Sequence, residues 1–109
     1  MSISYEKQEK YLLVNLEGKV DNKTAPEIQS SILNESVGFG YIIIDMSKVE
    51  YMSSAGLRVL LLLYRQVKAK NGTVCLSGVS DEIKDVMKIT GFVNFFKFTD
   101  TVDESKPNN

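Results

Sequence analysis

Two consecutive serines, Ser53 and Ser54, are the residues of this sequence best placed to do chemistry, because a long helix-forming run follows them directly. A serine at a helix N-terminus can accept a hydrogen bond from the unpaired amides of the first turn. The same amides and the positive end of the helix dipole also stabilise an anion. The pair could therefore simply start a helix that runs to about Lys70, or one of its hydroxyls could accept a phosphoryl group without unfolding that helix.

Other reactive side chains are scarce in the 109 residues, which contain no histidine and one cysteine, Cys75. The usual general base near neutral pH, the usual partner of a nucleophilic serine and the commonest transition-metal ligand are therefore missing. Cys75 lies in an apolar run, where a lone thiol usually acts as a small hydrophobic residue. No Gly-x-Ser-x-Gly elbow or phosphate-binding glycine-rich loop occurs. We expect a protein that is not an enzyme and holds no metal or cofactor.

The charge pattern argues against binding to nucleic acid. The chain has 13 basic and 14 acidic residues and a net charge of -1, whereas nucleic-acid binding needs clustered Lys and Arg to replace counterions. The first residues lack the basic and apolar regions of a secretion signal. The longest apolar run, residues 59–64, is far shorter than the roughly 20 residues that a membrane span requires. We expect a soluble, cytoplasmic protein that does not bind membranes.

The elements that position the serines follow from the apolar pattern. Strands are predicted at residues 3–5, 11–16, 41–44 and 73–76, with a polar hairpin turn between the first two. Between the later strands, apolar residues recur at helical spacing, which predicts helices there. Consecutive strands that are joined by helices pair in parallel. The sequence therefore predicts an α/β fold with a mixed, mostly parallel sheet of four or five strands, one of them antiparallel, and three or four helices.

The starts of the first and third helices carry their own signals. Thr24 and Glu27 have the spacing of a capping box, and Pro26 falls in the first turn, where its missing N–H is not needed. Ser80 is predicted to cap the third helix, and Gly91 to end it. The apolar residues of this third helix predicted to face inward are Ile83, Val86 and Met87.

The helix after Ser54 has one broad apolar face on a helical wheel. This face is predicted to pack on the sheet, with Arg58 and Arg65 on the opposite side. Leu62 breaks the pattern, since it falls between Arg58 and Gln66 on the side of Ala55. It is either a scattered surface leucine or a docking contact beside Ser54. The residues of the inward face are Leu57, Leu60, Leu61, Tyr64 and Val67.

The connecting segments are expected to be irregular. Residues 46–53 are predicted to form a loop that Val49, Tyr51 and Met52 tether to the core, which would hold Ser54 in one place. The aromatic cluster at residues 92–98 is typical of a core-facing strand plus a turn. The polar tail from residue 100 is predicted to form a weak helical turn and then fray.

Asp21 is the best second member of a site with Ser54. It follows the second predicted strand, and Ser54 follows the third. Functional groups in such sheets gather at the carboxyl ends of the strands, so both residues approach one edge if these strands are neighbours. Alternatively, Asp21 is a turn residue that bonds local amides.

The segment around Ser54 resembles the phosphorylatable loop of the STAS domain family of anti-sigma factor antagonists, whose usual pattern is Asp-Ser-Ser/Thr-Gly-Leu followed by an apolar helix. Gly56 and Leu57 match, and Ser54 falls on the residue that the family's kinases phosphorylate. Ser53 stands where Asp is usual, and Ala55 where Ser or Thr is usual. Other family motifs occur in order: Leu-Glu-Gly-Lys-Val-Asp at 16–21 with Thr24-Ala25, Ile-Ile-Ile-Asp at 42–45, and Lys-Ile-Thr-Gly-Phe at 88–92.

This resemblance covers nearly the whole chain and implies a single STAS domain over residues 1–109. It implies a protein that, when unphosphorylated, binds an anti-sigma factor with Ser/Thr kinase activity and so releases the sigma factor. Phosphorylation of Ser54, in preference to Ser53, would break the complex, and a PP2C-type phosphatase would restore it. The alternative is a constitutive STAS scaffold subunit of a larger regulatory or transport assembly. The expected partner-binding residues are Asp21, Ser53, Ser54, Ala55, Arg58 and Leu62.

Overall fold

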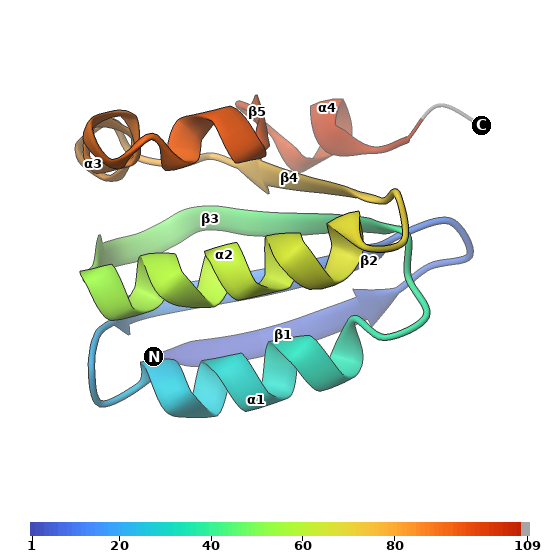
Figure 1. Ribbon diagram of the computed structural model, residues 1–109, viewed down its shortest axis with the longest axis horizontal. Helices are drawn as coiled ribbons and strands as arrows, with labels where there is room; N and C mark the ends of the chain where they lie inside the picture. Colours follow the sequence, from blue (N-terminus) through green and yellow to red (C-terminus); the bar gives the residue numbers. More distant parts are fainter. Residues whose placement is uncertain (108–109) are drawn as a thin grey trace.

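The computed structural model describes residues 1–107, which form a five-stranded sheet with flanking helices (Figure 1). The strands are β1 (Ser2–Lys7), β2 (Leu12–Val20), β3 (Tyr41–Met52), β4 (Thr73–Ser77) and β5 (Lys97–Thr99). The helices are α1 (Ala25–Glu35), α2 (Ser54–Lys68), α3 (Asp81–Thr90), the 3-10 helix η1 (Phe92–Phe95) and α4 (Val102–Ser105).

The order of the strands in the sheet is β1-β2-β3-β4-β5. The β1–β2 pair is antiparallel, and every later pair is parallel. This confirms the α/β fold with one antiparallel strand that the sequence predicts. Because β2 and β3 are parallel neighbours, their carboxyl ends lie at the same edge of the sheet, and the segments that lead into α1 and α2 leave from that edge.

One face of the sheet carries most of the core. Helices α1 and α2 lie side by side over this face (Figure 1), and α3 and η1 add further apolar side chains to it. The opposite face has a smaller apolar cluster of Leu13, Ile43 and Cys75, against which Val102 of α4 packs. The main core includes Val14, Leu16, Ile28, Ile32, Ile42, Ile44, Leu57, Leu60, Leu63, Leu76, Met87 and Phe96.

The segment predicted as a loop at residues 46–53 is instead the second half of β3. The strand continues to Met52, and after Asp45 it pairs only with β2, because the pairing with β4 ends at Asp45 and Ser77. Val49 and Met52 are buried, as expected, but Tyr51 is 53% exposed and does not tether the segment to the core. Two shifts of register in the β2–β3 ladder disrupt the alternation of apolar and polar residues in this segment. Because this alternation is the sequence signal of a strand, the second half of β3 was not predicted.

The capping box predicted at Thr24 is wrong. Thr24 has the N-cap position of α1, but its side chain does not cap the helix. Its Oγ1 accepts a hydrogen bond from the amide of Asp21 at 2.9 Å and donates one to the carbonyl of Lys19 at 3.2 Å. The Thr24 hydroxyl therefore stabilises the turn after β2 and does not cap α1. The predicted cap at Ser80 is confirmed, since its Oγ accepts the amide of Ile83 at 3.3 Å.

The inward faces of two helices differ in part from the prediction. In α2 the buried face is rotated, so that Val59 and Leu63 are buried and Leu61 is partly exposed. In α3, Ile83 and Met87 are buried as predicted, whereas Val86 is 43% exposed. Which residues of a helix are buried depends on the neighbouring elements that it contacts, and a helical wheel does not show these neighbours.

The aromatic cluster forms a 3-10 turn and a short strand. Only Phe96 of its phenylalanines is buried, while Phe95 is 41% exposed and stacks on Tyr64 of α2 with ring centroids 5.0 Å apart. The polar tail forms α4, whose N-terminus has a capping box between Thr101 and Glu104. Residues 108–109 of the predicted fraying tail lie outside the described residues.

Candidate functional site

The candidate site lies at the sheet edge where β2 and β3 both end. Val20 and Met52 are partners in the parallel register, and the amide of Ser53 donates a hydrogen bond to the carbonyl of Val20 at 2.8 Å. Helix α2 begins at the next residue, Ser54. The chain thus passes from strand to helix without an intervening loop, and the serines have a fixed position on the sheet.

Gly56 lets the first turn of α2 sit close to these strand ends. A Cβ atom added at Gly56 would lie 2.7 Å from the Cγ of Met52 and 2.8 Å from the Cγ1 of Val20. Such distances are shorter than real carbon contacts allow, so a side chain here would force Met52, Val20 or the helix itself to shift. The glycine is needed for this close approach and sets the height of Ser54 above the edge.

The two serines have different surroundings. Ser53 has the extended backbone of an N-cap, with φ -82° and ψ 177°, but its side chain makes no capping hydrogen bond. Its Oγ is buried and has no hydrogen-bond partner among the described residues. Ser54 is the first residue of α2, and its side chain is exposed. Of the two hydroxyls, only that of Ser54 is open to a modifying enzyme.

Asp21 is a turn residue in the structure. Its Oδ1 accepts hydrogen bonds from the amides of Lys23 at 3.0 Å and Thr24 at 3.1 Å. These bonds from Thr24 and Lys23 favour the carboxylate, and they hold the pKa of Asp21 below its ordinary value. The carboxylate therefore fixes the turn between β2 and α1, the second role that the sequence allows.

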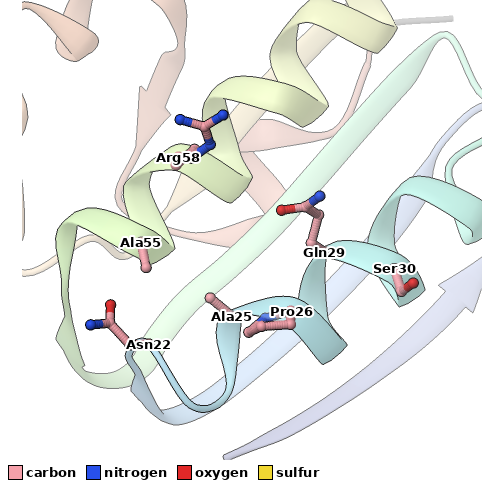
Figure 2. Close-up of a pocket in the computed structure, with 7 residues that line it drawn as sticks. All are labelled: Asn22, Ala25, Pro26, Gln29, Ser30, Ala55 and Arg58. Carbon is pink, nitrogen blue, oxygen red and sulfur yellow. The ribbon is translucent and has the colours of Figure 1, made fainter.

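Two shallow grooves lie beside the start of α2, and both are lined by Asn22. The first has a volume of about 290 Å³ and lies along the strand ends; we call it the strand-end groove, and its residues are Asp21, Asn22, Lys23, Tyr51 and Ser53. The second has a volume of about 340 Å³ and lies between the first turns of α1 and α2 (Figure 2); we call it the helix groove. Its residues are Asn22, Ala25, Pro26, Gln29, Ser30, Ala55 and Arg58.

The structure brings most of the predicted site residues together. Asp21 and Ser53 line the strand-end groove, Ala55 and Arg58 line the helix groove, and Ser54 lies between Ser53 and Ala55 in the chain. Leu62 lies one turn beyond Arg58 on α2, is partly exposed and lines neither groove. The site is thus a continuous surface around Ser54, with Leu62 outside it.

Sequence reasoning missed seven of the residues that line the two grooves, which are Asn22, Lys23, Ala25, Pro26, Gln29, Ser30 and Tyr51. Asn22 and Lys23 follow Asp21 directly, so a turn placed at this edge could have indicated them. No local signal marks Gln29, because its place in the groove depends on how α1 packs beside α2. Tyr51 was expected to tether its segment to the core together with Val49 and Met52, so it was not considered as a surface residue.

The electrostatics of this edge suit an anionic group. Helix α2 has no acidic residue in its first turn, so its free amides and dipole are not compensated by a side chain there. Arg58 lines the helix groove, and Lys23 lines the strand-end groove together with the Asp21 carboxylate. Within residues 1–107, no group of three or more His, Cys, Asp or Glu residues is arranged to hold a metal. None of the described helices combines the length and apolar character needed to cross a membrane.

Comparison with known sequences finds one family model and several relatives that match most of the chain. The family model described as the STAS domain matches residues 2–105. BtrV of Bordetella bronchiseptica, a proposed anti-sigma factor antagonist, is 28% identical over 97 residues, which cover 88% of this chain and 84% of BtrV. The anti-sigma-B factor antagonist of Listeria monocytogenes is 27% identical over 113 residues, which cover 100% of this chain and 99% of that protein.

Comparison with solved structures finds the same fold. The unphosphorylated form of the anti-sigma factor antagonist SpoIIAA matches with a TM-score of 0.76 and 19% identity, over 94% of this chain and 92% of SpoIIAA. The phosphorylated form of SpoIIAA from Bacillus matches with a TM-score of 0.75 and 20% identity, over 94% and 95% of the two chains.

Proposed function

This chain belongs to the STAS domain family, and on that premise we propose that it is an anti-sigma factor antagonist switched by phosphorylation of Ser54. In its unphosphorylated form it binds an anti-sigma factor that is also a Ser/Thr kinase, and the sigma factor is released. Phosphorylation of Ser54 breaks this complex, and a PP2C-type phosphatase restores the binding form.

One observation carries the proposal: the Ser54 hydroxyl is exposed at the N-terminus of α2, while the Ser53 hydroxyl beside it is buried. A kinase needs access to the acceptor oxygen, and only Ser54 offers it. The close packing of Gly56 on the strand ends holds the acceptor in one position. The relatives named anti-sigma factor antagonists support the assignment of the partner class.

A phosphate at this position would alter binding and leave the fold intact. It adds about -1.5 to -2 charges, which the amides and dipole at the start of α2 stabilise. In a complex the same charge would have to leave water, which is costly unless the partner provides a cation. A coupling of ~1–3 kcal/mol changes the affinity several-fold to about a hundredfold. SpoIIAA has been solved with and without phosphate, and this chain matches both folds about equally well.

The proposed partner surface consists of the two grooves and the turn of α2 between them. Asp21 and Ser53 shape the strand-end groove, although the Ser53 hydroxyl is buried and contributes no direct contact. Ala55 and Arg58 form the wall of the helix groove that belongs to α2. Leu62 is proposed as a contact at the margin of this surface, one turn beyond Arg58.

The test is a phosphorylation assay with matched serine variants. The purified chain is incubated with ATP and each anti-sigma factor kinase encoded in the same genome, and added phosphate is located by peptide mass. Binding of the same kinases is measured with and without ATP. Wild type and Ser53→Ala should take up one phosphate at Ser54 and dissociate from the kinase. Ser54→Ala should take up none and stay bound when ATP is present.

Two results would contradict the proposal. If the Ser54→Ala variant takes up phosphate, or if it dissociates from the kinase when ATP is added, Ser54 is not the switch. Stable binding of the wild type with no phosphate on any residue would support the constitutive scaffold instead, with the Ser54 position serving only to start α2.

A further inference from the structure

A second exposed surface starts at the same sheet edge and runs along α3. Its apolar side chains are Tyr51, which is 53% exposed, Val86, which is 43% exposed, and Ile89, which is 86% exposed. We call these three residues the α3 strip. They make up half of the six large hydrophobic side chains that are exposed in the described residues, so the exposed apolar area is concentrated here.

The three residues of the α3 strip lie close together. Tyr51 and Val86 line the same small groove, which has a volume of about 110 Å³. Ile89 follows Val86 by three residues on α3, so the two share one side of the helix. The remaining apolar residues of the groove are Met52 and Ile83, which are buried. A partner side chain could therefore extend the core of the protein at this point.

Packing within the chain does not account for the exposed residues of α3. Ile83 and Met87 already anchor the helix to the core, with exposed fractions of 6% and 0%. An isoleucine that is 86% exposed gains almost nothing from folding. Single exposed apolar residues are common on protein surfaces, but a cluster beside a groove is typical of an interaction site.

The charges around the α3 strip indicate the chemistry of what binds there. Two carboxylates, Glu50 and Glu82, line the groove, and no Lys or Arg among residues 1–107 lines it. On α3, Lys84 lies on the other side of the helix, where its Nζ is 5.5 Å from the centroid of the Phe98 ring. The groove between Tyr51 and Val86 thus has an acidic border, whereas Lys23 lies beyond Tyr51 in the strand-end groove. The acidic border favours a partner segment whose apolar side chain enters this groove and is flanked by basic residues.

We propose that the α3 strip is a second contact site for the anti-sigma factor, which inserts an apolar side chain flanked by Lys or Arg. This inference rests on the proposed function. Tyr51 supports it, because the same side chain also lines the strand-end groove with Ser53. One partner could therefore cover the edge around Ser54 and the α3 strip without a break. The strip adds affinity and specificity, while Ser54 provides the switch.

The experiment measures the affinity of the anti-sigma factor for variants of the unphosphorylated chain by calorimetry. The double variant Val86→Ser, Ile89→Ser should lower the affinity at least about tenfold, the effect expected when the removed side chains lie in the well-packed centre of a contact site. Glu50→Lys should lower it as well, and the loss should shrink at high salt, where surface charges are screened. All three substituted residues are exposed, and thermal melting checks that both variants fold.

Matched controls use the same substitutions away from the strip. Val37→Ser removes another exposed apolar side chain, at a residue that is 61% exposed beyond the end of α1. Glu9→Lys reverses an exposed charge in the β1–β2 turn. Both controls should bind like the wild type.

The outcomes separate this inference from the proposed function. If the wild type binds and the strip variants bind as tightly as the controls, the second contact site is refuted and the anti-sigma factor assignment stands. If Glu50→Lys binds more tightly, the basic character of the partner segment is wrong. If no anti-sigma factor of the same genome binds the wild type, the proposed function fails, and with it this occupant of the strip.

Discussion

Helices α2 and α3 both begin with a serine after a parallel strand, yet their N-termini differ. At α3 the Oγ of Ser80 accepts the amide of Ile83, and Asp81 and Glu82 place carboxylates in the first turn. At α2 the side chain of Ser53 makes no capping bond, and the first turn has no acidic residue. The chain thus compensates the start of α3 with its own groups and leaves the start of α2 without such compensation.

This difference shows what separates a structural helix end from a candidate regulatory one. At a capped and acidic N-terminus one amide is already bonded by the cap, and the carboxylates of the first turn already compensate the dipole, so an added anion is less favoured there. The N-terminus of α2 keeps its amides and its dipole available, with an exposed hydroxyl in place. Substitutions at the two helix starts should therefore have different effects on stability.

Gly56→Val should lower the free energy of unfolding by about 1–3 kcal/mol or more, because the new side chain collides with Val20 and Met52. Urea denaturation measures the loss. Gly40→Val is the matched control, since nothing lies within 4 Å of its Cβ position. If both variants unfold at the same urea concentration, the start of α2 is not held by close packing on the strands.

Ser80→Ala should lower the free energy of unfolding by about 1 kcal/mol, the usual effect of removing a cap. Ser53→Ala should change it little or raise it, because the hydroxyl that is removed is buried and lacks a partner in the described residues. The same denaturation experiment compares the two variants. An equal loss for Ser53→Ala would mean that the two serines cap their helices alike.

Ser54→Asp should raise the free energy of unfolding by about 0.3–1 kcal/mol at low salt, because it adds a carboxylate to a helix start that has none. The gain should fall as salt is added. Ser54→Asn is the neutral control of similar size. The aspartate should also weaken partner binding, although less than phosphate, because it carries less charge. A stability gain that salt leaves unchanged would argue against the dipole.

Asp21→Asn should have the smallest effect, and the effect should depend on pH. The amides of Thr24 and Lys23 lower the pKa of Asp21 in the folded state, so its carboxylate stabilises the fold above the ordinary pKa of Asp, about 3.9. This contribution is lost as the pH falls below that value toward the folded-state pKa. Wild type and variant should therefore converge in acid-denaturation curves, and a constant difference down to pH 2 would exclude this role.

The order of the elements and the position of Ser54 could be predicted from local pattern. The β-branched run at Ile42–Ile44 predicts a strand, and the two serines followed by a helix-forming apolar run predict the start of a helix; both elements form as expected. The second half of β3 was missed because register shifts against β2 disturb the alternation of its side chains. The exposure of Val86 was missed because a helical wheel does not show where the neighbouring elements end.

The sequence by itself determined the α/β fold, the order of its strands and helices, and the pair of serines at the start of α2, since these follow from apolar periodicity and turn residues within each segment. Only the tertiary structure decided which of the two hydroxyls is exposed. The amide of Ser53 is bonded to the carbonyl of Val20 on the neighbouring strand and its hydroxyl is buried, whereas Ser54, one residue later, is exposed. The packing of neighbours distant in sequence sets such access, and no local pattern encodes it.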